Sequence, residues 1–570
     1  MGAAQKLVDT GLAKLGYRYI NIDDGWWLKR RESDGRMMIR TQIFPSAKAA
    51  GKGDSTFRPF TDRLHRMGLK AGIYSDAGRN ACSQAYDLAS PNLPEGDTAE
   101  REVGLYGHVD QDIALYFKTW GFDYIKVDAC GLNVYGADAP VVREQNYRPF
   151  PPLIDTTYIG RTRVDEVRRI YEDIGAAIKA NNPDNDYIFS ICNWGTADVR
   201  RWGGEVGNLW RTSGDITPTW TRMLHNFDSA STRALYSRPG AWNDPDMLFI
   251  GHGDFDENHL TEAQSHFSLW AMIDAPLIIG YDLRKAPDSL LKIWGNADLV
   301  RVNQDSGGDQ AVLAYDSDDV QILVKTLADS HTKAVAIFNR GMAGADVTLT
   351  AAQLKMAAGT GITLKNLWTG AQSEFTGETT FSLRPRETLV FEVFGTRELP
   401  DGMYLSEIPG RIHVAEDGIV DPRPDPVIHQ MIGPWNGTRG TGERPAYTGW
   451  GGAQADASPY RENLQIAGQP FTSGIGILSR SRMEVRNNKE FRRFEAMAGV
   501  DDSGLNNGES VHFIVYGDGR KLVESTDMTY GTPAQNLSAD ITGIDVVELV
   551  VLSDGAEPQV VTWGNARLLH

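Results

Sequence analysis

Short apolar runs alternate with longer segments of helical periodicity from the start of the chain to about residue 300. An apolar run followed by an amphipathic stretch is typical of a β-strand and of the helix that leads back to the next parallel strand. The apolar runs lie at residues 17–23, 69–76, 122–128, 187–192, 208–215, 241–246 and 276–282. The clearest helical stretches lie at residues 57–67, 110–119, 164–180 and 260–273. This alternation predicts a parallel sheet, either doubly wound or closed into a barrel.

The texture of the sequence changes after residue 303. Short alternating runs at residues 320–326, 333–339, 346–349 and 388–394 predict an antiparallel β-domain. A proline-rich stretch around residues 395–426 indicates a boundary or a long loop, and the remainder again reads as all-β. Because 570 residues are too many for one core, we expect several domains. The expected division is an α/β barrel over 1–305, a β-sandwich over 306–396, a linker over 397–426 and a second β-sandwich over 427–570.

The chain is acidic, with 57 Lys and Arg against 75 Asp and Glu and a formal net charge of -18. Such a surface repels the phosphates of nucleic acids and anionic lipid. No apolar run approaches the ~20 residues that a membrane-spanning helix needs. Nucleic acid is therefore not expected as a partner, and no membrane span is expected.

Carboxylates stand at or just beyond the ends of almost all the apolar runs. They are Asp23, Asp24, Asp76, Asp128, Asp215 and Asp246. Because active sites of parallel α/β folds lie at the carboxyl ends of the strands, these acids should converge on one cleft. Converging carboxylates can bind a metal ion, act as an acid/base pair or hold the hydroxyl groups of a sugar.

Histidine and cysteine are not clustered at these strand ends, which disfavours a transition-metal site and leaves only an all-oxygen Mg²⁺ site open. Aromatic residues near the acids favour a sugar, because aromatic rings stack on sugar faces. These residues are Trp26, Trp27, Tyr74, Trp194, Trp210 and Trp242. Ordinary core packing is the alternative for each of them.

Asp128 ends the run at residues 122–128, which also carries Lys126. Side chains alternate along a strand, so Lys126 and Asp128 project to the same side. A nearby cation keeps a carboxylate ionised, although an ordinary ion pair at a strand end explains the same pattern. Glycoside hydrolysis commonly uses one ionised and one protonated carboxyl group, and Asp128 suits the ionised role.

Five ordered motifs carry a specific resemblance to a known family. They are Tyr19-Ile-Asn-Ile-Asp-Asp-Gly-Trp26, Gly72-Ile-Tyr-Ser-Asp-Ala-Gly78, Tyr124-Ile-Lys-Val-Asp-Ala-Cys130, Trp210-Arg-Thr-Ser-Gly-Asp-Ile216 and Trp242-Asn-Asp-Pro-Asp-Met247. Together they resemble glycoside hydrolase family 27, the retaining α-galactosidases and α-N-acetylgalactosaminidases, also called melibiases. The resemblance implies a (β/α)8 TIM-type barrel followed by an antiparallel Greek-key β-sandwich. This chain begins too late to supply the family's first barrel strand, so we expect that its N-terminus is truncated.

The resemblance also implies roles for individual residues. Asp128 would be the nucleophile and Asp215 the general acid/base. Asp23 and Asp24 would hold O4 and O6 of a galactose-like ring, and Lys126 would contact the sugar and keep Asp128 ionised.

Further residues would line the same pocket. Tyr74 would form part of its wall, and Arg211 and Asp246 match residues that bind the O2 side of the sugar. Asn193 stands where many α-galactosidases place a glutamate near O2. Because an amide both donates and accepts hydrogen bonds, Asn193 suits either a plain hydroxyl or an altered C2 substituent.

The three cysteines cannot all pair with one another, and taken alone they are more often buried thiols. The resemblance implies a disulfide between Cys82 and Cys130, which leaves Cys192 unpaired. The start of the chain lacks the pattern of a secretory signal, so the protein is either cytoplasmic or has lost a leader. We expect a secreted or periplasmic protein.

The C-terminal part contains the motifs Gly474-Ile-Gly-Ile-Leu478, Val515-Tyr-Gly-Asp-Gly519 and Trp563-Gly-Asn-Ala566. These motifs resemble those of the NPCBM domain, a carbohydrate-binding module of the family 51 type, and the resemblance implies a jelly-roll-like β-sandwich fold. Trp435, Trp450 and Trp563 are candidates for a sugar platform, with burial in the sandwich as the alternative.

The sequence therefore predicts a retaining exo-glycosidase that needs no cofactor and releases terminal α-linked galactose from oligosaccharides, polysaccharides or glycoconjugates. The alternatives are an α-N-acetylgalactosaminidase or a β-L-arabinopyranosidase of the same family and, from another class, a non-catalytic galactose-binding protein. A retaining mechanism requires the two carboxyl groups to lie about 5–5.5 Å apart. We expect the long loop at residues 131–163 to wall the leaving-group side, the alternative being a plain surface insertion.

Overall fold

The computed structural model of the chain describes residues 1–48, 53–155, 159–328, 332–419 and 451–570. It divides into two compact units. The first unit holds Met1–Arg211 with Asp282–Lys285, and the second holds Thr212–Tyr281 with Ala286–His570. None of the helices within the described ranges is both long and apolar enough to cross a bilayer.

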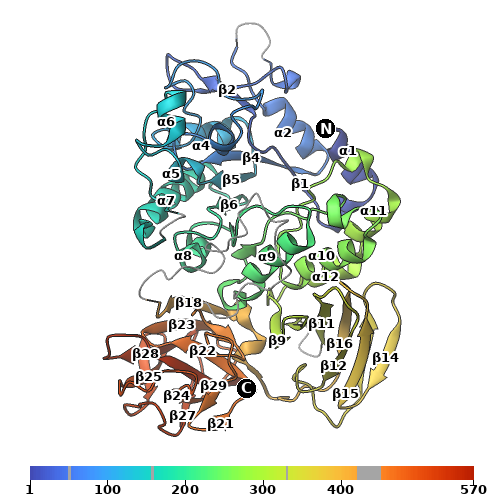
Figure 1. The fold of residues 1–570 in the computed structure, drawn as a ribbon, viewed down its shortest axis with the longest axis vertical. Helices are drawn as coiled ribbons and strands as arrows, with labels where there is room; N and C mark the ends of the chain where they lie inside the picture. Colours follow the sequence, from blue (N-terminus) through green and yellow to red (C-terminus); the bar gives the residue numbers. More distant parts are fainter. Residues whose placement is uncertain (49–52, 156–158, 329–331, 420–450) are drawn as a thin grey trace. The chain divides into compact units, whose positions relative to one another are not determined.

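A six-stranded parallel sheet forms the centre of the N-terminal part (Figure 1). Its order is β1 (Tyr19–Asn21), β4 (Lys70–Asp76), β5 (Tyr124–Asp128), β6 (Ile188–Cys192), β7 (Leu209–Arg211) and β8 (Trp242–Asp244). The registers from β1 to β7 are all parallel. The sequence prediction of a parallel sheet is confirmed, and each of these strands lies within a predicted run.

Helices connect these strands, as the alternation predicts. The helix α1 (Gly2–Asp9) precedes β1, and the helices between β1 and β7 are α2 (Arg58–Arg66), α3 (Cys82–Tyr86), α4 (Val109–Ile113), α5 (Cys130–Asn133), α6 (Pro140–Gln145), α7 (Val164–Asn181) and α8 (Val199–Val206). The same unit has short η turns at Leu12–Leu15, Pro45–Ala47, Ile159–Arg161 and Leu283–Lys285. The helix α7 buries Val167, Tyr171, Ile174 and Ile178, which recur at helical spacing and so form one apolar stripe.

Three expectations for this part need correction. Residues 276–282 do not form a strand, because only Ile279 makes a single parallel bridge, to Leu248. The helix predicted at residues 110–119 is the short helix α4 followed by one π-helical segment at Ala114–Thr119. The hairpin of β2 (Trp27–Arg30) and β3 (Met37–Ile39) lies in a region that we did not predict as strand.

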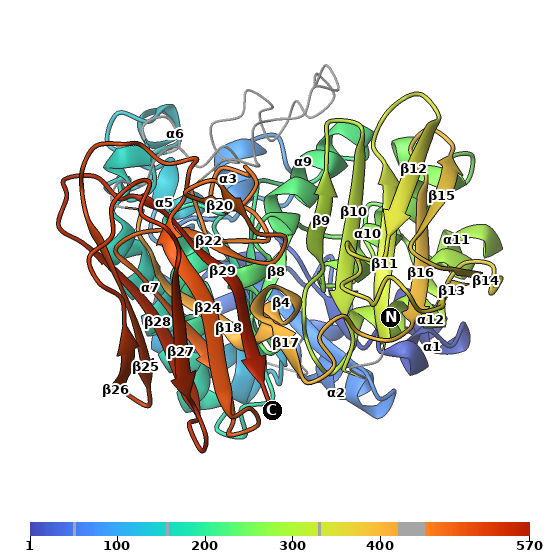
Figure 2. The ribbon, with the colours of Figure 1, turned by 90° about the horizontal axis from the view of Figure 1, so that it is seen from below.

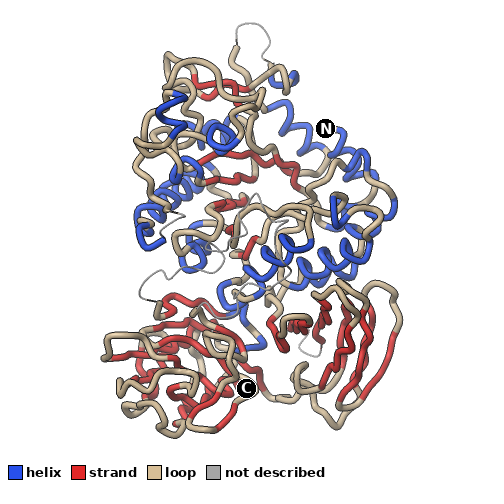
Figure 3. Tube along the Cα trace, in the orientation of Figure 1, coloured by secondary structure: helices blue, strands red, loops and turns tan. Residues whose placement is uncertain are grey.

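The helices of the second unit precede its β-domains (Figure 3). They are α9 (Trp220–Ser231), α10 (Leu260–Met272), α11 (Asp288–Trp294) and α12 (Ala297–Asn303), with short η turns at Ala234–Tyr236 (η5) and Gly253–Phe255. After residue 303 the described helical elements are two single turns, η8 (Leu405–Glu407) and η9 (Pro409–Arg411).

An antiparallel β-sandwich follows α12. Its larger sheet has the order β14 (Gln372–Phe375), β13 (Ile362–Asn366), β16 (Thr388–Phe394), β11 (Thr332–Asn339), β10 (Val320–Thr326) and β9 (Val312–Asp316). The smaller sheet pairs β12 (Ala345–Thr350) with β15 (Glu378–Leu383). Side chains from both sheets share one core, which confirms the predicted β-sandwich.

Residues 402–419 and 451–570 form a second sandwich, called here the C-terminal module (Figure 2). One sheet has the order β19 (Gln454–Ala455), β22 (Gly474–Leu478), β29 (Val560–Leu569), β24 (Arg493–Val500) and β27 (Gln535–Asp540), with β17 (Gly402–Tyr404) paired to β29. The other has the order β18 (Ile412–Asp417), β23 (Ser481–Arg486), β28 (Val546–Ser553), β25 (Val511–Gly517) and β26 (Arg520–Glu524). A separate hairpin pairs β20 (Gln465–Ile466) with β21 (Gln469–Pro470).

The strands β17 and β18 lie within residues 397–426, which the sequence predicts as a linker. They pair with β29 and β23, so this part of the stretch belongs to the C-terminal module. The proline-rich segment at residues 421–426 lies outside the described residues. Residues 402–417 are therefore not a linker between two domains, although the sequence predicts one there.

The turn η5, which follows α9, packs into the core of the C-terminal module. Leu235 and Tyr236 belong to the same buried cluster as Trp563 of β29. The hydroxyl of Tyr236 donates to Asp417 at 3.1 Å and accepts from the amide of Ala453 at 3.1 Å. The core of the module is therefore completed by residues that precede the middle sandwich in the chain.

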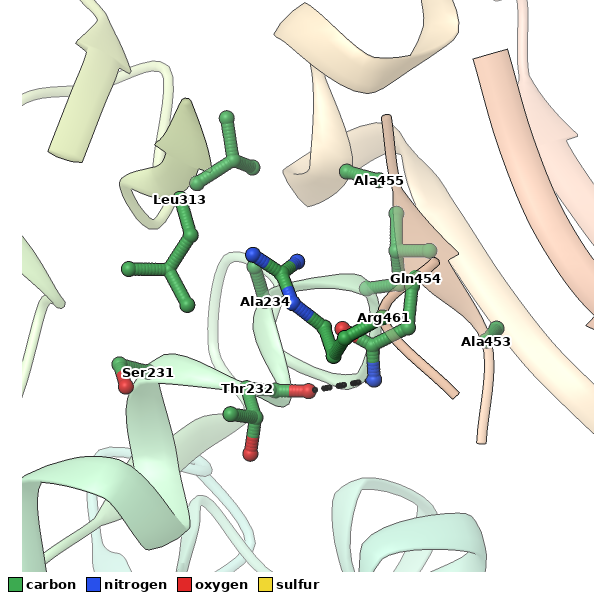
Figure 4. Close-up of a pocket in the computed structure, with 10 residues that line it drawn as sticks. Ser231, Thr232, Ala234, Leu313, Ala453, Gln454, Ala455 and Arg461 are labelled. Atoms are coloured by element: carbon green, nitrogen blue, oxygen red, sulfur yellow. Dashed lines mark hydrogen bonds between the residues drawn. The ribbon is translucent and has the colours of Figure 1, made fainter. Parts of the chain in front are cut away.

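Three segments of the second unit meet around a small cavity beside η5 (Figure 4). The end of α9 and η5, the strand β9, and the C-terminal module all line it. The amide of Gln454 donates to the carbonyl of Thr232 at 3.2 Å, and Ala234, Val312 and Ala455 form a small apolar cluster. The lining of this cavity contains no carboxylate, unlike the ends of the parallel strands.

Buried ion pairs join the middle sandwich to the C-terminal module. Lys333 of β11 and Arg397 both contact the carboxylate of Glu407, at 2.5 and 3.0 Å. Lys355 contacts Asp456 at 2.6 Å. All five side chains are at most 12% exposed, so each charge depends on its partner.

Two buried carboxyl groups beside Lys325 carry a pH dependence. Burial raises the pKa of Asp274 and of Asp309 from the ordinary value of 3.8 to about 7. The folded protein therefore keeps these protons at pH values where the unfolded chain has released them. The stability from each group is fully present below about pH 4 and is lost as the pH rises to about 7, by at most about 1.4 kcal/mol per pH unit.

Replacing Asp309 with asparagine is expected to flatten this slope. The asparagine oxygen can still accept from the amide of Gly410, which donates to Asp309 at 2.8 Å. The measurement is the melting temperature between pH 4.5 and 7.5, with the exposed Asp318→Asn as the control that removes the same formal charge. Parallel curves for wild type and Asp309→Asn would contradict the prediction.

Candidate active site

Asp24 and Asp23 follow β1 and are held differently. The carboxylate of Asp24 accepts from the amide of Ser83 at 2.8 Å and from its hydroxyl at 2.9 Å. Burial raises the pKa of Asp24 from 3.8 to about 6. The side chain of Asp23 is 67% exposed and pairs with Nζ of Lys126 at 3.3 Å. Asp24 is thus fixed in place, whereas Asp23 faces solvent.

Lys126 lies in β5 opposite Tyr74 of β4 in the parallel register. Its Nζ is 5.3 Å from the centroid of the Tyr74 ring, which is buried at 1% exposure. Lys126 forms an ion pair with Asp23, and its role as the electrostatic partner of Asp128 stays a prediction. Lys126 therefore joins Tyr74 and Asp23, two of the predicted pocket residues.

Asp128 ends β5 and is 5% exposed. Its backbone carbonyl accepts from the amide of Ala77 at 2.8 Å and from the hydroxyl of Tyr171 at 3.2 Å. In the register Asp128 stands opposite Asp76 of β4 and Cys192 of β6. These two hydrogen bonds fix the backbone of Asp128, and so the position from which its side chain projects, at the carboxyl end of the sheet.

The disulfide between Cys82 and Cys130 is present, with a Cα–Cα distance of 5.0 Å. It links α3, which carries Ser83, to α5, which begins two residues after Asp128. Asp76 also lies close to the two sulfur atoms. These three residues do not make a metal site, because both thiols are consumed by the disulfide.

Asn193 and Arg211 lie near the end of β6 and at the end of β7, and both are buried. The amide nitrogen of Asn193 donates to the carbonyl of Thr196 at 2.9 Å, and its Oδ1 has no partner among the described residues. Nη1 of Arg211 lies 3.6 Å from Sγ of Cys192, the residue opposite Asp128. The free capacity of Asn193 is therefore that of an acceptor.

Asp215 and Asp246 belong to the second unit and are connected through the backbone. Oδ2 of Asp246 accepts from the amide of Ile216 at 2.8 Å, directly after Asp215. Nε of Arg222 on α9 donates to the carbonyl of Asp215 at 2.8 Å. Asp246 has a φ of 81°, a left-handed conformation that is uncommon outside glycine and typical of functional loops. These contacts fix the loop that carries Asp215.

Several aromatic residues predicted to face sugar are core residues instead. Trp26, Trp27 and Trp210 are at most 1% exposed, and Trp26 packs on Trp27 and Trp120 with ring centroids 5.3 and 5.6 Å apart. Trp194 and Trp242 are half-buried. In the C-terminal module Trp563 is fully buried, so it cannot form a sugar platform, and Trp435 and Trp450 lie outside the described residues.

Sequence reasoning missed the residues that hold the site. Ser83 anchors Asp24, Tyr171 holds the carbonyl of Asp128, and Arg222 holds that of Asp215. The side chain of Asn226 donates to two carbonyls, that of Gly214 directly before Asp215 and that of Pro245 directly before Asp246. The only signal for Ser83 is its place beside Cys82, and nothing in the sequence marks the others.

Comparisons with known proteins agree with this organisation. A family model described as alpha galactosidase A matches residues 1–139 and 164–305. The model of the alpha galactosidase C-terminal beta sandwich domain matches residues 317–393, and that of the NPCBM/NEW2 domain matches residues 441–569.

Individual relatives are similar over most of their length. An α-galactosidase of Oryza sativa subsp. japonica is 33% identical over 388 residues, which is 68% of this chain and 78% of that protein. A solved structure of a Bacteroides fragilis protein assigned to the α-galactosidase/melibiase type is 32% identical, with a TM-score of 0.55, and covers 69% of this chain and 74% of that one. The structure of α-galactosidase I from Mortierella vinacea, 24% identical over 70% of this chain and 92% of its own, has a TM-score of 0.55 and supports the fold alone.

The matched family models follow the order of the barrel, the middle sandwich and the C-terminal module, and the strand-end acids lie inside the first match. The chain is therefore a glycosidase of the α-galactosidase family, glycoside hydrolase family 27, with a C-terminal NPCBM-type domain.

Proposed function

We propose that this glycosidase is a retaining exo-acting α-galactosidase, with Asp128 as the nucleophile and Asp215 as the general acid/base. The observation that carries the proposal is the cluster at the ends of β1, β4 and β5. There a buried carboxylate, Asp128, shares one edge of the sheet with Asp23, Asp24 and Lys126. Carboxylates and a cation are the groups that hold sugar hydroxyls, and Asp128 lies beside them as a further carboxylate that can attack the anomeric carbon.

The mechanism proceeds in two displacements. Asp128 attacks the anomeric carbon while Asp215 gives its proton to the departing glycosidic oxygen, so that a covalent β-galactosyl enzyme forms. Asp215 then takes a proton from water, and the water oxygen displaces Asp128 to release α-galactose. Each step inverts the anomeric centre, so the two together retain its configuration. The separation of about 5–5.5 Å between the two carboxyl groups stays a prediction.

The buried side chain of Asn193 offers an acceptor to the O2 side of the sugar. Its amide nitrogen is engaged by Thr196, which leaves Oδ1 to accept one hydrogen bond. A 2-hydroxyl group can donate that bond and needs little space. An α-N-acetylgalactosaminidase and a β-L-arabinopyranosidase are the second candidates, because they use the same two displacements.

The proposed substrates are terminal α-galactosides of oligosaccharides, polysaccharides or glycoconjugates. Residues of the loop at 131–163 form an ion pair and a hydrogen bond with residues of the loop after β4. We assign the loop at 131–163 to the side of the site where the leaving group would lie. Arg148 pairs with the buried Glu102, and Arg101 donates to the hydroxyl of Tyr147 at 2.8 Å. A wall held in this way would limit the size of the leaving group.

We place the protein in an oxidising compartment, that is, secreted or periplasmic. The disulfide between Cys82 and Cys130 supports this location, because reducing compartments keep thiols free.

The test of the proposed function is a screen of three nitrophenyl glycosides: the α-galactoside, the α-N-acetylgalactosaminide and the β-L-arabinopyranoside. We expect the highest kcat/KM for the α-galactoside, and proton NMR should show α-galactose as the first product. The β-anomer as first product would refute retention. Binding of galactose without any hydrolysis would identify a non-catalytic binding protein instead.

A further inference from the structure

Asp76 is a buried acid next to Asp128 that has no role in the mechanism above. It ends β4 directly opposite Asp128 in the parallel register, so both side chains project from the same face of the sheet. Asp76 is 0% exposed. It is therefore the closest carboxyl group to the proposed nucleophile along the register of β4 and β5.

One oxygen of Asp76 holds two loops together. Oδ1 accepts from the amide of Gly78 at 2.7 Å and from the amide of Gly131 at 3.1 Å. Gly78 belongs to the turn after β4, whereas Gly131 lies in α5, three residues after Asp128. Through this single oxygen, the segment that follows the nucleophile is attached to the neighbouring strand.

Both glycines are required by this close approach. A Cβ on Gly131 would lie 2.7 Å from Oδ1 of Asp76 and 2.7 Å from the carbonyl of Asn80. A Cβ on Gly78 would overlap the backbone of Gly131. The two loops are packed so tightly that only glycine leaves room for the carboxyl group between them.

The second oxygen of Asp76 has a different environment. Oδ2 is buried and has no hydrogen-bond partner among the described residues, and no lysine or arginine in that part of the chain forms an ion pair with Asp76. The charges that act on Asp76 come from Asp128 on β5 and Asp24 after β1, both acidic. The neighbouring tyrosines Tyr74, Tyr135 and Tyr171 bring no positive charge.

An ionised carboxylate in this position would be unfavourable. Burial, followed by the charge of Asp128, raises the pKa of Asp76 well above its ordinary value. Two adjacent carboxylates in a low-dielectric site do not both ionise, so one of the pair keeps a proton.

We propose that Asp76 is a positioning residue for the nucleophile: a neutral carboxyl group that ties the segment after Asp128 to β4 and leaves the negative charge of the pair on Asp128. This inference rests on the proposed function, because it takes Asp128 to be the nucleophile. According to this inference, Asp76 acts on Asp128 through its shape and its hydrogen bonds, and it must carry no charge. Asparagine has that shape and is always neutral, so it should replace Asp76, whereas alanine should not.

The first experiment compares Asp76→Asn and Asp76→Ala with wild type on nitrophenyl α-galactoside. Asp76→Ala should lower kcat by about 10²-fold with little change in KM, because a misdirected nucleophile slows the chemistry and leaves the sugar contacts intact. Asp76→Asn should keep kcat within a few fold of wild type, and the acid limb of its pH profile should not move. Ser75→Ala, a buried neighbour on the opposite face of β4, is the control and should behave as wild type.

Either of two results would overturn the proposal. An acid limb that moves to lower pH in Asp76→Asn would show that Asp76 carries a charge that opposes ionisation of Asp128. A loss of kcat in Asp76→Asn as large as in Asp76→Ala would show that the carboxyl group itself is needed.

A second measurement does not depend on hydrolysis and so separates this proposal from the proposed function. The infrared spectrum of the wild type at pH 7, minus that of Asp76→Asn, should contain the carbonyl band of a protonated carboxyl group. A difference spectrum with carboxylate bands only would refute a neutral Asp76, whatever the enzyme hydrolyses.

Discussion

Replacing Asp128 with alanine is expected to remove measurable hydrolysis of nitrophenyl α-galactoside, and sodium azide should restore turnover with β-galactosyl azide as the product. The alanine leaves space at the carboxyl end of β5, where azide can take the place of the missing nucleophile. Only one displacement then occurs, so the product has the inverted configuration. Thin-layer chromatography and NMR of the azide product are the measurements.

The acid/base variant should give the opposite stereochemistry. Asp215→Ala is expected to lower kcat/KM by about 10²–10⁴-fold, with the smaller losses for leaving groups that need no proton. Its covalent intermediate still forms through Asp128, so azide should attack it and yield α-galactosyl azide. The two azide products therefore distinguish the two carboxylates from each other.

The matched control is Asp123→Asn at the opposite end of β5. Asp123 directly precedes β5, accepts from the amide of Ala71 at 2.8 Å and pairs with His65 at 2.8 Å, so this change removes a carboxylate at the other end of the strand without touching the site. Its activity should stay close to wild type. Residual hydrolysis in Asp128→Ala equal to that of this control would remove Asp128 from the mechanism.

The second large effect concerns stability. Arg340 and Asp228 form a buried bidentate pair, with nitrogen–oxygen distances of 2.6 and 2.7 Å. Asp228 lies on α9 and Arg340 follows β11, so the pair joins the helix to the middle sandwich. Arg340→Met is expected to cost roughly 3–5 kcal/mol, because it leaves the carboxylate of Asp228 buried beside an apolar side chain.

Chemical denaturation measures the change in the free energy of unfolding, and two further variants serve for comparison. Arg340→Met combined with Asp228→Asn should recover part of the loss, because the stranded charge is gone. Arg301→Met is the control, since Arg301 is 49% exposed and such a pair is worth only about 0.2–1 kcal/mol. Equal destabilisation by Arg340→Met and Arg301→Met would contradict the prediction.

The central strands were predictable because burial leaves a clear record in the sequence. The strands β4, β5 and β6 are apolar, bounded by helical segments, and lie within two residues of the predicted bounds. Residues 276–282 carry the same apolar signal, yet only Ile279 bridges to another strand. An apolar run indicates that a segment is buried, but it does not show whether a neighbouring strand pairs with that segment through backbone hydrogen bonds.

The strand-end acids stand out in the sequence, whereas several of the contacts around them do not. Alternation along β5 places Lys126 on the side of Asp128, and the structure also pairs its ammonium group with Asp23, which follows β1, two strands away. The tryptophans at residues 26 and 27 are close to Asp24 in the chain, yet both rings are buried, and that of Trp26 packs against Trp120. Proximity in sequence does not determine the face on which a side chain lies.

The packing of Leu235 and Tyr236 into the C-terminal module has a consequence for biosynthesis. Trp563 of β29 belongs to the same core, and β29 is the central strand of its sheet. At about 5–20 residues per second, a ribosome needs roughly 20–60 s to reach that strand after it has made Tyr236. During this interval Leu235 and Tyr236 lack the side chains of β29 that belong to their core in the folded protein. The burial of Leu235 and Tyr236 in this core is therefore completed only after the C-terminal module has been synthesised.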